Sequence, residues 1–194
     1  MDPQADRNES LAGQEQAEEK IQRSRFLAVA APATDAAAAS ALVARLRREH
    51  HDARHVCSAW RLGAPGQTVE ARHDDGEPAG TGGEPILAAI RAAGLTDVAV
   101  AVVRHFGGIK LGTGGLGRAY GGVAQAALAA APRRTVRLGR RWRLVLPYDQ
   151  QKTLQRVLIA HEGETEATDY AAVVTWTVWL PRSRGEAFVA AVRE

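Results

Sequence analysis

The strongest constraint on the fold is a nearly uninterrupted apolar run, DVAVAVVR, at residues 97–104. A run of this length fits a strand better than a helix, because helices of globular domains are usually longer. A strand with only one buried face would alternate apolar and polar residues, and this one does not. The run therefore predicts a central strand that is covered on both faces, or is at least deeply packed.

Helices and further strands surround this central strand and build a first domain. Apolar spacing identifies them, and glycine and proline breakers separate them. In chain order the sequence predicts a strand at 25–31, a helix capped by Thr34 or Asp35, and strands at 55–62 and 68–73. A helix with Pro85 at or near its first turn and Gly94 just past its end follows, then the central strand and a helix at 116–130.

A second set of elements follows Pro132. Their predicted order is a strand at 141–148, a helix capped by Asp149, strands at 165–170 and 172–180, and a helix opened by a capping box of Ser183 and Glu186. A ferredoxin-type sandwich has one further strand after that helix, and the pattern lacks it. The fold class is therefore α+β with two domains, the second ferredoxin-like and without its last strand.

Composition sets the class of protein and the outer boundaries. Hydrophobic residues make up 45% and charged residues 24% of the chain, as in folded globular proteins. We expect a mobile polar tail at 1–20, a first domain at 21–131, a linker at 132–139 and a second domain at 140–194. The single cysteine, the lack of a signal-peptide pattern and the lack of a membrane span favour the cytoplasm.

The segment FGGIKLGTGGLGRAYGG, at 106–122, concentrates glycines around one lysine, Lys110. Glycines let a partner approach the backbone closely, and the amides at the start of the following helix attract anions. The spacing matches neither a P-loop nor a dinucleotide fingerprint, and no cofactor is predicted. Two interpretations stay open, a phosphate site and a tight turn with close helix packing.

A second glycine-rich segment, HDDGEPAGT at 73–81, carries three acids and a histidine. Asp74, Asp75 and Glu77 could together hold a divalent cation or act in acid–base chemistry. They could equally be turn and capping residues, since Asp-Gly and Glu-Pro are turn sequences. Upstream, His55 and Cys57 should share one strand face, where packing is a simpler explanation than catalysis.

The stretch 133–143 holds six arginines and no acid. These junction arginines are Arg133, Arg134, Arg137, Arg140, Arg141 and Arg143. Guanidinium groups pair with phosphates, and Trp142 among them could stack on an exposed base. Alternatively, the arginines are a solvated linker and strand face while Trp142 packs inward.

Together the two glycine-rich segments resemble the signature of the IMPACT/YigZ family. The matching blocks are DDGEPAGTGGEPIL at 74–87 and VVRHFGGIKLGTGGLGRAYGG at 102–122, and the flanking RSRFLA and HVCSAW are similar too. The resemblance implies a first domain with the fold of the second domain of ribosomal protein S5, and a second domain like the α+β modules at the end of elongation factor G.

The resemblance also implies a role in translation. Eukaryotic members relieve translational control by competing for the activator of a kinase, and bacterial members are inferred to bind nucleic acid or the ribosome. The candidate binding surface carried over from the family is Asp74, Asp75, Glu77, Pro78, Arg104, Phe106, Gly107, Gly108, Lys110, Gly112, Thr113, Gly114 and Gly115.

Three functional hypotheses follow from these features. The first is a translation-associated binding protein that contacts RNA or the ribosome through the loop of Lys110 and the junction arginines. The second is a metal-assisted hydrolase or transferase for a phosphorylated small molecule, with the three acids holding the ion. The third is a regulator that binds a translation-factor protein without contacting RNA.

Overall fold

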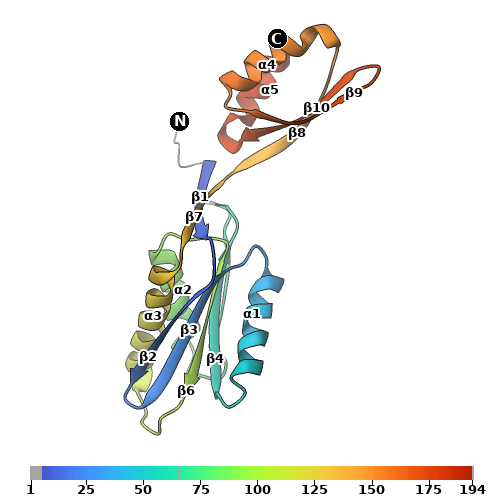
Figure 1. Ribbon diagram of the computed structural model, residues 1–194. Coiled ribbons are helices and arrows are strands. Elements are labelled where there is room, and N and C mark those ends of the chain that lie inside the picture. The colour runs from blue at the N-terminus through green and yellow to red at the C-terminus, as the bar shows by residue number, and fades with distance from the viewer. Residues whose placement is uncertain (1–5, 65, 194) are drawn as a thin grey trace. The chain divides into compact units, whose positions relative to one another are not determined.

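The computed structural model describes residues 6–64 and 66–193, and the chain folds into two compact units. The first unit runs from Glu9 to Thr135, and the second consists of the residues up to Asn8 together with Val136 onward. Figure 1 labels the elements of both. The prediction of a mixed α+β chain with two domains is confirmed.

A five-stranded antiparallel sheet forms the centre of the first unit. The strand order is β2 (Glu15–Ile21), β3 (Ser24–Pro32), β6 (Val98–His105), β4 (His55–Leu62) and β5 (Val69–His73). The predicted central strand is β6, which pairs with β3 on one side and β4 on the other. All of its residues except the last are buried.

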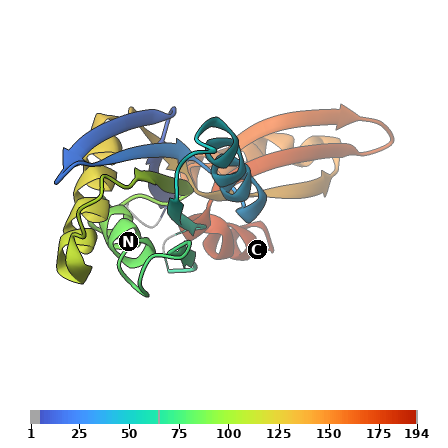
Figure 2. The same cartoon turned by 90° about the horizontal axis from the view of Figure 1, so that it is seen from below.

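Helices cover both faces of this sheet (Figure 1), and Figure 2 shows the arrangement from below. Helices α2 (Gly83–Ala92) and α3 (Gly112–Ala130) pack on one face, and α1 (Ala36–Glu49) packs on the other. Successive side chains of a strand point to opposite faces, so β6 contributes to two cores. Val98, Val100 and Val102 lie in the core under α2 and α3, whereas Ala99, Ala101 and Val103 lie in the core under α1.

The prediction of a mobile tail at 1–20 is wrong for its described part, which forms β1 (Arg7–Leu11) and β2. Residues 1–5 lie outside the described residues. Strand β2 pairs along its whole length with β3, and Ala17 and Ile21 pack against the core under α2 and α3. The remaining side chains of this edge strand are mostly charged and solvated, which is how edge strands avoid unwanted pairing. Because the sequence of β2 is mostly polar, it led to the prediction of a tail.

The predicted linker at 132–139 is also wrong, because most of it is strand. Strand β7 (Arg133–Arg137) pairs with β1 in a two-stranded sheet, and the boundary between the units falls within both strands. In the first unit the amide of Ala12 donates to the carbonyl of Pro132 at 2.7 Å, and the Thr135 hydroxyl donates to Glu9 at 2.6 Å. Because the partner strand comes from the N-terminus, the local sequence could not reveal this pairing.

The second unit consists of one antiparallel sheet with two helices. The elements are β8 (Gly139–Leu146), the short 3₁₀ turn η2 (Tyr148–Gln150), α4 (Gln151–Ala160), β9 (Glu164–Tyr170), β10 (Val174–Pro181), a second turn η3 (Arg182–Arg184), and α5 (Gly185–Arg193). The strand order is β8-β10-β9, and Leu158 of α4 and Phe188 of α5 share one core with the sheet. The described part of this unit thus has the ferredoxin-type pattern with three strands.

The predicted helix caps have mixed outcomes. Asp35 caps α1, since its carboxylate accepts from the amide of Ala38 at 2.7 Å. Asp149 does not cap α4, whose first residue follows Gln150 with no side-chain cap. The Ser183 hydroxyl donates to Asp6 instead of capping α5. Within the described ranges, no helix is long and apolar enough to cross a membrane.

Candidate functional site

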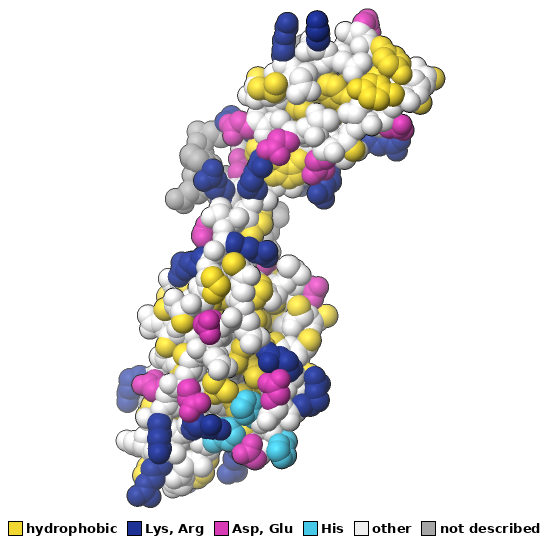
Figure 3. Space-filling view, in the orientation of Figure 1, with side chains coloured by type: hydrophobic (Ala, Val, Ile, Leu, Met, Phe, Trp, Pro, Cys, Tyr) yellow, Lys and Arg dark blue, Asp and Glu magenta, His cyan; other side chains and the backbone are white. Residues whose placement is uncertain are grey.

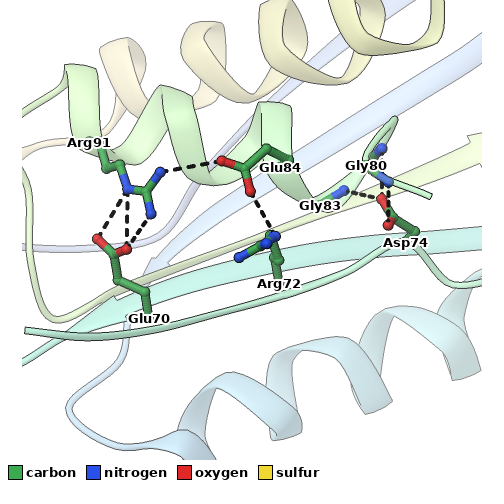
Figure 4. A network of polar contacts seen from close by, with 8 residues as sticks. Glu70, Arg72, Asp74, Gly80, Gly83, Glu84 and Arg91 are labelled. Carbon is green, nitrogen blue, oxygen red and sulfur yellow. Dashed lines mark hydrogen bonds and ion pairs between the residues drawn. The ribbon is translucent and has the colours of Figure 1, made fainter. Parts of the chain in front are cut away.

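Asp74 organises the first glycine-rich segment. Its carboxylate accepts backbone hydrogen bonds from Gly80, Gly82 and Gly83 at 2.8–2.9 Å (Figure 4). Burial acts to raise the pKa of this carboxyl group, but the hydrogen bonds outweigh it and hold the pKa below its ordinary value. The loop is thus folded around one carboxylate, which also positions the start of α2.

Asp75 is a structural residue as well. One of its carboxylate oxygens accepts from the Val56 amide at 2.6 Å, and the other pairs with Arg47 of α1. Its carbonyl lies 2.7 Å from Nδ1 of His55, and its backbone has a positive φ of 50°. Asp75 therefore fastens the loop to β4 and α1.

A ladder of charged side chains holds α2 against β5 (Figure 4). Arg91 donates to Glu70 at 2.5 Å and to Glu84 at 3.3 Å, and Arg72 pairs with Glu84 at 2.7 Å. The hydrogen bond from Arg91 lowers the pKa of Glu70. This ladder keeps the helix that follows the acidic loop in place.

The three acids do not form a common metal site. Asp74 and Asp75 use their oxygens on backbone amides and Arg47, and the buried Glu77 side chain pairs with Arg104 and Tyr120. No group of three or more His, Cys, Asp or Glu side chains in the described ranges is arranged to hold a metal ion. The hydrogen bonds of Asp74 and Asp75 fit the interpretation of these acids as turn and capping residues.

The second glycine-rich segment bends sharply and then enters α3 at Gly112, four residues earlier than the sequence predicted. Thr113, Gly114 and Gly115 consequently belong to the first turn of the helix rather than to a loop. Only glycine fits at position 107, where a Cβ atom would lie 2.0 Å from the Arg23 carbonyl oxygen. Leu111 precedes the helix without a side-chain cap, and the first turn has no acid.

The two glycine-rich segments meet in one cleft with a volume of about 390 Å³. Its lining combines residues predicted from both segments with residues of β4 and α3. The lining residues are Arg54, His55, Glu77, Pro78, Arg104, Phe106, Lys110, Leu111, Gly112, Thr113 and Leu116. The sequence did not single out Arg54, Leu111 or Leu116, because only the sheet brings β4 beside the start of α3.

A buried ion pair lies at the cleft. Arg104 donates to Oε1 of Glu77 at 2.6 Å, and the Tyr120 hydroxyl donates to the same oxygen at 2.8 Å. The side chains of Arg104 and Glu77 are only 6% and 4% exposed. A buried charge without a partner is strongly destabilising, so each of the two charges requires the other. Tyr120 was missed as a site residue, although it lies within the second glycine-rich segment.

Aromatic rings flank the guanidinium of Arg104. Its central carbon lies 5.5 Å from the ring centre of Phe26 and 5.3 Å from that of Phe106. Phe26 is fully buried and packs edge-on against Tyr120, whereas Phe106 is 43% exposed. Phe106 therefore presents an aromatic surface at the cleft.

Cys57 is a buried packing residue. Its thiol donates to the carbonyl of Asp74 at 2.9 Å. Burial raises the pKa of this thiol to about 12, so the nucleophilic thiolate is scarce at neutral pH. The packing explanation of the His55 and Cys57 pair is the one that fits.

Two cations of the cleft, Arg54 and Lys110, form no ion pair with any described residue. Both side chains are exposed. Elsewhere on the first unit, basic and acidic side chains are interspersed in the view of Figure 3. The cleft thus combines unneutralised positive charge with the uncapped start of a helix of 19 residues.

The junction arginines all have exposed side chains on β7 and β8. Arg137 pairs with Glu164 at 2.8 Å and lies 4.1 Å from the ring centre of Trp179, and Arg141 pairs with Glu166 at 2.6 Å. Trp142 is half-buried and packs against the core of the second unit, as in the inward-packing interpretation. No described acid pairs with the other junction arginines.

Comparison with known proteins identifies both halves of the chain. A family model described as "Impact N-terminal domain" matches residues 22–128, and one described as a domain of unknown function (DUF1949) matches residues 144–194.

Similar proteins extend over nearly the whole chain. IMPACT family member YigZ of Escherichia coli (strain K12) is 39% identical over 173 residues, which cover 89% of this chain and 85% of that protein. An IMPACT family member of Haemophilus influenzae is 34% identical over 91% of this chain and 86% of its own length. A crystal structure of a hypothetical protein, 37% identical, superposes with a TM-score of 0.69 over 96% of this chain and 91% of that one. The chain belongs to the IMPACT family.

Proposed function

We propose that this IMPACT-family protein binds RNA through the cleft of its first unit and acts in translation. The observation that carries the proposal is the position of Arg54 and Lys110. Both line the cleft that includes the uncapped start of α3, and neither has an acidic partner among the described residues. The family resemblance supports the link to translation, since eukaryotic relatives act in translational control.

The chemistry of the cleft suits a phosphate group. Backbone amides at a helix start and a nearby lysine are common phosphate ligands. Gly112, which lines the cleft, has open space where a Cβ atom would lie, so a phosphate can approach the backbone there. Phe106 adds an aromatic surface of the kind on which RNA bases stack.

The junction arginines supply further positive charge for an RNA backbone. Arg134, Arg140 and Arg143 are exposed and have no described ion-pair partner, in contrast to Arg137 and Arg141. The metal-assisted enzyme has less support, because Asp74 and Asp75 are committed to the fold of the loop.

A binding experiment with Lys110→Gln tests the proposal. Affinity for a structured RNA is measured over a series of salt concentrations for the natural protein and the variant. We expect weaker binding that is uniform across RNA sequences, and a salt slope smaller in magnitude by about 1, as for the loss of one phosphate contact.

Lys152→Gln is the matched control, because Lys152 is an exposed lysine of α4 outside the cleft. Equal effects of the two substitutions would contradict the assignment of the cleft. RNA binding absent at low salt, together with capture of a translation protein after nuclease treatment, would favour the protein-binding hypothesis instead.

A further inference from the structure

We infer that the cleft holds a single unpaired nucleotide, with its phosphate near Lys110 and its base between Phe106 and Glu77, and that it favours bases carrying an exocyclic amino group. The inference rests on the proposed function, because it specifies which part of an RNA the cleft takes.

The size of the cleft limits the ligand. Its volume of about 390 Å³ is at the small end of ligand sites, which span roughly 300 to 1,000 Å³. A space of this size suits one nucleotide and is too small for a stretch of duplex. A base that enters it must be unpaired, as at an RNA end, a bulge or a loop.

One side of the cleft offers donors for a phosphate. Lys110, the Thr113 hydroxyl and the amides of the first turn of α3 lie together, with no acid in that turn to compete. Gly112 has a positive φ of 67° and no atom within 4 Å of the position where its Cβ would be. The backbone is therefore open to close approach by an anion at this point.

Glu77 supplies a second and independent sign of a ligand. Its side chain is only 4% exposed and lines the cleft, and Oε1 already accepts from Arg104 and Tyr120. No described residue donates to Oε2. Nε of Arg104 is fully buried and lacks a described partner. A ligand that donates to Oε2 gives a partner to a carboxylate oxygen whose side chain is otherwise almost withdrawn from water.

The free oxygen of Glu77 explains the expected base preference. A carboxylate only accepts hydrogen bonds, so it pairs with the amino groups of adenine, cytosine and guanine. Uracil has carbonyl oxygens in their place, and its one base donor, N3–H, lies between two carbonyl oxygens that repel a carboxylate. We therefore expect uracil to pair less well with Glu77. Phe106 contributes stacking that every base can use.

Calorimetric titration of the full chain with small probes tests the inference. The probes are AMP, UMP, adenosine, ribose 5-phosphate and inorganic phosphate. We expect AMP to bind about tenfold more tightly than UMP, from the loss of one base contact. Adenosine and ribose 5-phosphate should both bind more weakly than AMP, since each lacks one of the two recognised parts. Equal affinity for AMP, UMP and ribose 5-phosphate would overturn the inference.

Two substitutions distinguish the contribution of the base to binding from that of the phosphate. Phe106→Ala should weaken AMP binding and leave inorganic phosphate binding unchanged. Ile109→Ala is the matched control, because Ile109 is 40% exposed in the same loop and does not line the cleft. Loss of AMP affinity in both variants would count against a base site at Phe106.

RNA probes distinguish failure of the inference from failure of the proposed function. The protein should prefer a hairpin with unpaired terminal adenosines to a blunt hairpin, and AMP should compete with the former. Equal binding of both hairpins, without AMP binding, overturns the single-nucleotide inference and leaves RNA binding intact. If the protein binds AMP but neither hairpin, the nucleotide pocket is supported, and the proposal that its nucleotide belongs to an RNA chain is overturned.

Discussion

At the level of single residues, a few positions determine the geometry of the cleft. Asp74 gathers three backbone amides, and Gly107 lets the chain pass Arg23 without a clash. The sequence pointed to both residues through their motifs. It left open whether the acids bind a metal or close a turn, because that depends on which amides reach the carboxylates after folding.

Asp74→Asn should destabilise the protein by about 1–3 kcal/mol at pH 7, the usual cost of disrupting hydrogen bonds to a partly buried charged group. Burial acts to raise the pKa of Asp74, but the bonds from Gly80, Gly83 and Gly82 lower it overall. A folded-state pKa below the unfolded value, about 3.9, means that the carboxylate stabilises the fold above that pH. The stabilisation is lost as pH falls through the folded-state pKa.

Urea unfolding at several pH values measures this effect. The free energy of unfolding should differ most between the natural protein and Asp74→Asn at pH 7. This difference should become smaller below about pH 4. Asp149→Asn is the control, since it removes an exposed carboxylate in η2. A variant at position 74 as stable as the natural protein at pH 7 would contradict the structural role of Asp74.

Gly107→Ala and Gly114→Ala should have opposite effects on thermal stability. A Cβ atom at 107 would meet the backbone of Arg23, so we expect a loss of about 1–3 kcal/mol or more. At 114, within α3, the nearest atom is a flexible Arg118 nitrogen at 3.5 Å, and alanine should add about 0.5–1 kcal/mol. Equal melting temperatures for the two variants would show that Gly107 does not lie close to the Arg23 backbone.

At the level of helices and strands, the central strand was the most predictable part of the fold. The run of apolar residues in β6 required two covered faces, and α1 on one face and α2 with α3 on the other provide the cover. Strands β1 and β2 were missed, because each owes its structure to backbone pairing with another part of the chain rather than to its own apolar pattern.

Hydrogen exchange tests the presence of β2 directly. Because β2 pairs with β3 on one side only, about every second amide between Glu15 and Ile21 should be protected from exchange. The amides of β6, which pairs on both sides, serve as the protected reference. Exchange throughout 15–21 at the rate of an unfolded peptide would support a mobile tail instead.

For the protein as a whole, the net charge of +3 is modest, and the placement of the cations matters more than their total. Several arginines are neutralised by nearby acids, such as Arg141 by Glu166. Others, including Arg134, Arg140 and Arg143, have no described ion-pair partner. RNA binding should therefore depend on this subset.

Replacing Arg134, Arg140 and Arg143 together by glutamine should weaken RNA binding and flatten its dependence on salt. Each lost phosphate contact should reduce the slope of log affinity against log salt by about 0.7 to 0.9. The matched control replaces Lys152, Arg156 and Arg193, three exposed cations on α4 and α5. An unchanged slope in the first triple variant would exclude these arginines from the RNA contact.

The family, the α+β class, the central strand and most helices follow from the amino-acid sequence alone, because apolar spacing and glycine-rich motifs are local properties of the chain. Three further relations became visible only in the folded protein: Glu77 pairs with Arg104 and Tyr120, Asp74 and Asp75 close a loop, and both glycine-rich segments line one cleft. The bonds of Asp74 close a loop within one segment, whereas the bonds of Asp75 and Glu77 and the cleft itself join residues far apart in the chain. The long-range relations exist because the order β2-β3-β6-β4-β5 places β4, β6 and the start of α3 side by side.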